Sequence, residues 1–190
     1  MLDFTPVREK KMTLSERTAD LTLTDLHDLT NELYDTILDI IADCTDADVV
    51  FVPEDPDAYD ASAATEAEMH MPWTLAHVLV HLTASAEEAA FLAAELARGV
   101  EWHGRSRYET PWQTVTMMEQ CYQRLAESRR MCLASLQIWP DQPHLDNYYQ
   151  RREGGQKINA IAYYSSGLMH AEGHLHQLRD IVSQSQSDSW

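Results

Sequence analysis

Apolar residues recur at helical spacing in four long segments of the chain, with polar residues on the opposite faces. In the first segment, at about residues 24–47, Leu26, Leu33 and Ile37 lie on one stripe. Apolar positions three and four residues apart share one face of an α-helix. The pattern recurs at residues 74–99, 110–138 and 157–183. We therefore predict four amphipathic helices.

Residues that commonly bound helices lie at the ends of these segments. Thr74 is a suitable N-cap for the second helix, and Gly99 is a natural C-terminal stop. Thr110 and Pro111 predict the start of the third helix, because proline is tolerated at the first helical position. Pro140 predicts its end.

Two long connections separate the helices. An acidic, proline-broken loop covers about residues 53–72, and a second loop covers residues 139–156. The second could line the mouth of a site, or its aromatic residues could serve packing alone. The pattern predicts an all-α fold, a four-helix bundle in one domain over residues 1–190. The bundle occupies about 24–183, after a flexible N-terminal segment and before a polar C-terminal tail.

Charge and composition narrow the class of protein. The chain has 190 residues, a formal net charge of −17 and 44% hydrophobic residues. So acidic a chain argues against nucleic acid and anionic membranes as partners. We expect a cytoplasmic protein, because the sequence shows no signal peptide and no apolar run of membrane-spanning length. The three scattered cysteines predict reduced core residues. They are Cys44, Cys121 and Cys132.

Two pairs of histidines give the chain its candidate chemistry. His170 and His174 are four residues apart, as are His77 and His81. At this spacing both rings of a pair leave the same face of a helix, about one turn apart. Two packed helices could present three or four imidazoles to one metal ion. The alternative is chance pairing, or buried histidines that are hydrogen-bonded in the core.

Two well-known metal motifs are absent from the sequence. The histidine faces lack the Glu-x-x-His pattern of di-iron bundles. The metalloprotease motif His-Glu-x-x-His is also missed, because Ala171 follows His170 and the glutamate is Glu172. A di-iron oxidase and a zincin protease are therefore disfavoured.

Trp73 is followed eight residues later by His81, and a later run contains His170, His174, Gln177 and Leu178. These motifs resemble those of the DinB-like, YfiT-like family of metal-dependent enzymes. The family's His-His-Arg-Gly-Gln run differs here, with His176 before Gln177. The resemblance implies a four-helix bundle and a divalent ion such as nickel or zinc. It assigns His81, His170 and His174 as the metal ligands.

Three neutral imidazoles leave a metal ion with open positions, as in catalytic sites. Water or a thiol could bind there and lose its proton. The resemblance therefore allows a hydrolase acting on a small-molecule substrate, or a transferase using a low-molecular-weight thiol such as bacillithiol or mycothiol. A non-catalytic metal-binding stress-response protein and an interaction protein remain alternatives. We expect a homodimer in each case.

No catalytic residue is assigned from the sequence. We expect His77 to be a core or rim histidine, with support of His81 or a fourth metal ligand as the alternative. We expect Glu88 to be solvated, with a general base facing the cavity as the alternative. We expect Tyr163 to serve packing, with a hydrogen bond to substrate as the alternative. Gln177 could hold an imidazole or a bound water, or simply pack between helices. The remaining histidines are expected on the surface or in loops: His27, His70, His103, His144 and His176.

Overall fold

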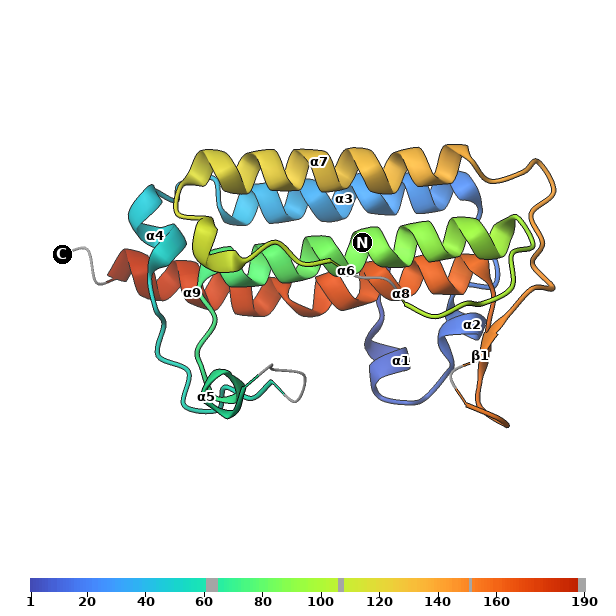
Figure 1. Ribbon diagram of the computed structural model, residues 1–190, viewed down its shortest axis with the longest axis horizontal. Helices are drawn as coiled ribbons and strands as arrows, with labels where there is room; N and C mark the ends of the chain where they lie inside the picture. The colour runs from blue at the N-terminus through green and yellow to red at the C-terminus, as the bar shows by residue number, and fades with distance from the viewer. Residues whose placement is uncertain (61–64, 106–107, 151, 188–190) are drawn as a thin grey trace.

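The computed structural model describes residues 1–60, 65–105, 108–150 and 152–187. Residues 61–64 of the acidic loop, Arg151 of the second loop and the last three residues of the tail lie outside this description. Figure 1 shows four long helical rods side by side, which confirms the predicted all-α bundle. They are α3 (Leu23–Ile40), α6 (Leu75–Ala97), α7 (Met118–Gln137), and α8 (Ala160–Gly173) continued by α9 (Leu175–Ser187).

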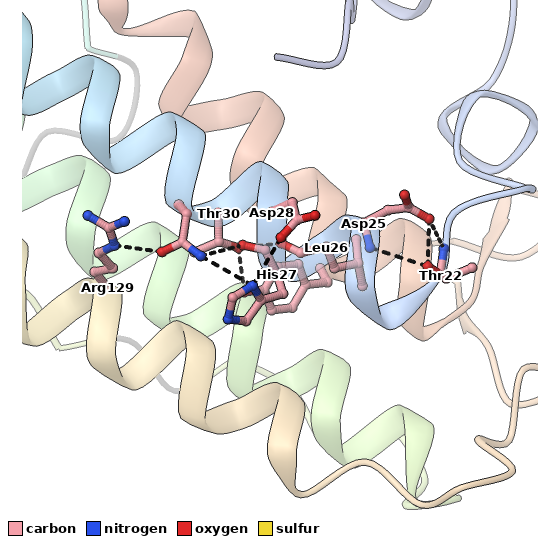
Figure 2. Close-up of polar contacts among 9 residues, drawn as sticks. Thr22, Asp25, Leu26, His27, Asp28, Thr30 and Arg129 are labelled. Carbon is pink, nitrogen blue, oxygen red and sulfur yellow. Dashed lines mark hydrogen bonds and ion pairs between the residues drawn. The ribbon is translucent and has the colours of Figure 1, made fainter.

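Helix α3 begins at a reciprocal cap. Thr22 Oγ1 accepts a hydrogen bond from the Asp25 backbone N–H, and the Asp25 carboxylate accepts one from the Thr22 N–H at 2.8 Å (Figure 2). Such a box satisfies N–H groups that the first helical turn leaves unpaired. Arg129 of α7 donates to Asn31 Oδ1 at 2.8 Å and ties the outer edges of α3 and α7 together.

The first helix is shorter than predicted. It ends at Ile40 instead of continuing to about residue 47, and a short helix, α4 (Asp46–Val50), follows. Thr45 and Asp48 form a cap of their own, with the Thr45 N–H 2.6 Å from Asp48 Oδ2. This local cap turns the chain so that Val49 is fully buried.

Helix α6 forms as predicted. Thr74 is its N-cap and accepts a hydrogen bond from the His77 N–H at 3.3 Å. The helix packs most extensively against α8 and also against α7. Its alanine-rich sequence allows close approach: a Cβ added at Gly167 of α8 would lie 2.6 Å from Ala89 Cβ.

The third helix begins later than predicted. Residues after Thr110 and Pro111 form a short 3₁₀ helix, η1 (Trp112–Thr114), and α7 starts at Met118. Two partners satisfy its first N–H groups. Gln120 Oε1 accepts from the Met117 N–H at 3.1 Å, and Asp46 Oδ1 accepts from the Met118 N–H at 2.8 Å.

The fourth helix begins at Ala160, capped by Asn159, instead of at about residue 157. Before it, β1 (Tyr149–Gln150) and β2 (Lys157–Ile158) pair as a small antiparallel hairpin. The helix is interrupted at His174, whose N–H bonds the Ala171 carbonyl at 3.1 Å. The two halves stay nearly collinear (Figure 1).

The N-terminal segment, which we expected to be flexible, packs on the bundle. It forms α1 (Thr5–Arg8) and α2 (Leu14–Arg17), while α5 (Glu66–Met69) lies in the acidic loop. Phe4 and Leu14 are buried in the core. Apolar side chains at these two positions hold the segment against the bundle.

Two further features concern the described part of the chain. None of its helices is both long and apolar enough to cross a membrane. The three cysteines are free. Cys121 and Cys132 are buried, and burial raises the pKa of Cys121 to about 12 and that of Cys132 to about 11. Both thiols therefore stay protonated near neutral pH.

Candidate metal centre

Three histidine rings from two helices meet on one side of α6. His81 of α6 lies against His170 of α8, with their Nε2 atoms 3.0 Å apart. His174, at the junction of α8 and α9, completes the group, and one nitrogen from each ring lies within 4.8 Å of the others. The predicted convergence of the two helices therefore occurs in the fold.

Gln177 orients the His174 ring. The Gln177 Oε1 atom lies 2.8 Å from His174 Nδ1. Because an amide oxygen only accepts, the His174 proton must be on Nδ1. The Nε2 atom of the neutral ring then carries the lone pair that a metal ligand requires.

The arrangement fits a small divalent ion. Nitrogen ligands about 2 Å from a tetrahedral metal lie about 3.3 Å from each other. The His81 to His170 separation of 3.0 Å is close to that value, and the 4.8 Å limit bounds the other separations. His81 and His174 are partly buried, whereas His170 is exposed at the cavity edge.

Glu109 lies beside the Nδ1 atom of the His81 ring. Its Oε1 atom lies 3.5 Å from His81 Nδ1, on the side opposite the atom that faces His170. A carboxylate at this position favours the tautomer with a proton on Nδ1 and directs Nε2 toward the other histidines. Glu109 comes from the connection before η1, so a loop supports a helix residue.

Replacing Glu109 by glutamine is expected to weaken divalent metal binding about tenfold, because loss of a carboxylate behind a ligand histidine lowers metal affinity. Competition titration of Zn²⁺ against a chromophoric chelator measures this. Glu119→Gln, at an exposed position on α7, is the matched control and should bind like the wild type. Equal affinities in the two variants would show that Glu109 does not orient His81.

His77 lies one turn before His81 between two tryptophans. Its ring stacks on Trp73 at 4.2 Å and on Trp112 at 5.0 Å between centroids. Burial lowers the pKa of His77 to about 4, although the nearby Glu109 acts in the opposite direction. The ring is therefore neutral near pH 7 and is a rim residue of the site, as predicted.

The lowered pKa of His77 predicts a pH-dependent stability. Below pH 6.5 the unfolded chain binds a proton at this ring that the folded chain takes up only near pH 4. The free energy of unfolding should therefore fall as the pH is lowered from 6.5 to about 4, by about 1 kcal/mol for this partly buried group. Urea denaturation with a chelator present should show a smaller fall for His77→Phe. Parallel pH profiles would contradict this account.

A cavity of about 1070 Å³ opens beside the histidines. Trp73 and Trp112 line it at the histidine end, and Ser85, Glu88 and Tyr163 line it farther along α6 and α8. The volume lies just above the upper end of the range of about 300–1,000 Å³ that is usual for sites for small molecules. The three imidazoles thus face a space large enough for a substrate.

The structure corrects one prediction about the cavity wall. Glu88, expected to be solvated, is only 7% exposed and pairs with Arg105. Tyr163 is buried as expected, but it also lines the cavity. The five histidines predicted to lie on the surface or in loops are exposed: His27, His70, His103, His144 and His176.

Sequence reasoning missed three residues of this region. Glu109, Arg105 and Trp112 come from the connection between α6 and α7. Arg105 and Glu109 lie where the sequence has no apolar periodicity, and Trp112 lies within the segment predicted as the third helix. The sequence therefore gives no sign that these three residues turn toward the cavity.

The fold and site define an all-helical bundle protein with a three-histidine group that could hold a metal ion. A family model described as the DinB superfamily matches residues 16–178. The match covers most of the sequence, so the chain belongs to the DinB superfamily. No curated protein and no solved structure matches the chain.

Proposed function

We propose that this protein is a metal-dependent enzyme that binds one divalent transition metal ion, nickel or zinc, through His81, His170 and His174. The observation that carries the proposal is the approach of three ring nitrogens to within 4.8 Å at the wall of a large cavity. A divalent ion with three neutral ligands lowers the pKa of a bound water or thiol, the chemistry of a hydrolase or a thiol transferase.

Other residues support this chemistry by position. Gln177 and Glu109 hold two of the rings with their Nε2 atoms toward the centre. Trp73 packs against His81 and His174, with ring centroids 4.7 and 5.9 Å apart. An aromatic wall of this kind limits access of water and restricts ring motion, so the donors stay aligned.

Free cysteines support a reducing compartment, and we propose that the protein acts in the cytoplasm. The homodimer remains a prediction, for which light scattering of the purified protein gives a direct test. Both proposals are independent of the metal assignment.

The proposed activity is tested by turnover with and without metal. Bacillithiol or mycothiol is offered with monochlorobimane as an electrophile, and nitrophenyl acetate is offered for hydrolysis. We expect product formation that needs added Ni²⁺ or Zn²⁺ and is lost in His174→Ala but kept in His176→Ala. Metal binding that stabilises the fold without any turnover would support the non-catalytic alternative instead.

A further inference from the structure

The cavity has a second polar end that the metal centre does not use. Glu88 lies seven residues after His81 on α6, a distance of about 10 Å along the helix. Ser85 is three residues before Glu88 and shares its face. Both line the cavity, and Glu88 is 7% exposed and Ser85 is 9% exposed.

Part of the hydrogen-bonding capacity at this end is unused. Glu88 Oε2 accepts from Arg105 Nε at 2.9 Å and also from Arg105 Nη2. Glu88 Oε1 and Ser85 Oγ are buried, and neither has a hydrogen-bond partner among the described residues. Buried polar atoms are normally satisfied, and an unmet acceptor is costly. These two atoms therefore point to a donor group brought by a ligand.

The charge of the cavity indicates which kind of donor fits. Four carboxylates line the described cavity wall, against the single guanidinium of Arg105. They belong to Asp60, Glu68, Glu88 and Glu109. Tyr163 adds no charge, because burial raises its pKa to about 12. Such a wall favours a cation over an anion.

The geometry points to an ammonium-binding subsite formed by Glu88 and Ser85. The substrate is then a bifunctional small molecule, with a metal-binding group such as a thiol at one end and a protonated amine about 10 Å away. This inference rests on the proposed function, because it takes the histidine centre as the site of the other end. Arg105 fixes Glu88 through one oxygen and leaves the second for the amine.

The test uses protein loaded with Co²⁺, whose thiolate complexes absorb in the near ultraviolet. Aminohexanethiol and hexanethiol are titrated separately, and the absorption band gives each Kd. We expect aminohexanethiol to bind the wild type about tenfold more tightly than hexanethiol. Glu88→Gln should reduce this ratio to near one, and Ser85→Ala should reduce it severalfold. Glu95→Gln, on α6 but outside the cavity lining, should keep the wild-type ratio.

The other outcomes separate the two proposals. Equal affinities of the two thiols for the wild type would overturn the subsite while the metal centre stands. Tighter binding of mercaptohexanoic acid than of aminohexanethiol would assign this end to a carboxylate held by Arg105, and would also overturn it. Absence of the absorption band with every thiol would overturn the metal proposal and this inference together.

Discussion

Replacing His174 by alanine is expected to weaken Ni²⁺ or Zn²⁺ binding by more than about a hundredfold. Changes to residues that merely support a ligand lower metal affinity about 10- to 100-fold, and removal of a direct donor lowers it further. The variant loses one of the three nitrogens that meet within 4.8 Å. Isothermal titration calorimetry of the metal-free proteins measures the difference.

His176→Ala is the matched control for this experiment. His176 lies two residues from His174, but it is exposed and pairs with Asp180 at 2.7 Å. The control should bind metal like the wild type. Metal at a thousandfold excess over the wild-type Kd should raise the unfolding free energy of wild type and control by about 4 kcal/mol, and that of His174→Ala by no more than about 1.4 kcal/mol. Equal metal affinities for the two variants would remove His174 from the site.

Gly167→Ala is expected to destabilise the fold by about 2 kcal/mol, because an added methyl group overpacks the contact between α6 and α8. The new Cβ would lie 2.6 Å from Ala89 Cβ and 3.5 Å from Ala86 Cα. The helices must separate to admit it. This separation also moves His81 away from His170, so metal affinity should fall with stability. Urea denaturation measures the first effect and calorimetry the second.

Gly173→Ala is the control, since among the described residues a Cβ there lies near only Arg8 Nη2, at 3.6 Å. In α8 this change should be neutral or stabilise by about 0.5 kcal/mol, because alanine favours a helix over glycine. Adding Ala89→Gly to Gly167→Ala should recover part of the loss, which a double-mutant cycle detects. A Gly167→Ala protein as stable as Gly173→Ala would contradict the close contact.

The sequence predicted the parts of the structure that depend on helical periodicity. Histidines four residues apart share a helix face, and the packing of α6 on α8 brings His81 to His170. Thr74 caps α6 as predicted, because capping is a contact within one turn. Such local rules are legible in a single sequence.

The features that the sequence did not reveal depend on contacts between distant segments. The start of α7 is set partly by Asp46, which lies 72 positions before Met118. Glu88 is buried because Arg105 pairs with it from a loop. Glu109 reaches His81 from the same connection. Neither Arg105 nor Glu109 lies in a periodic pattern that would indicate which way its side chain points.

Metal content tests the central claim most directly. The untagged protein, purified without chelators and incubated with Ni²⁺ or Zn²⁺, is desalted and analysed by inductively coupled plasma mass spectrometry beside the triple alanine variant at His81, His170 and His174. We expect about one ion per chain in the wild type and none in the variant. Equal metal content in the two proteins, or none in either, would contradict a metal centre at these histidines.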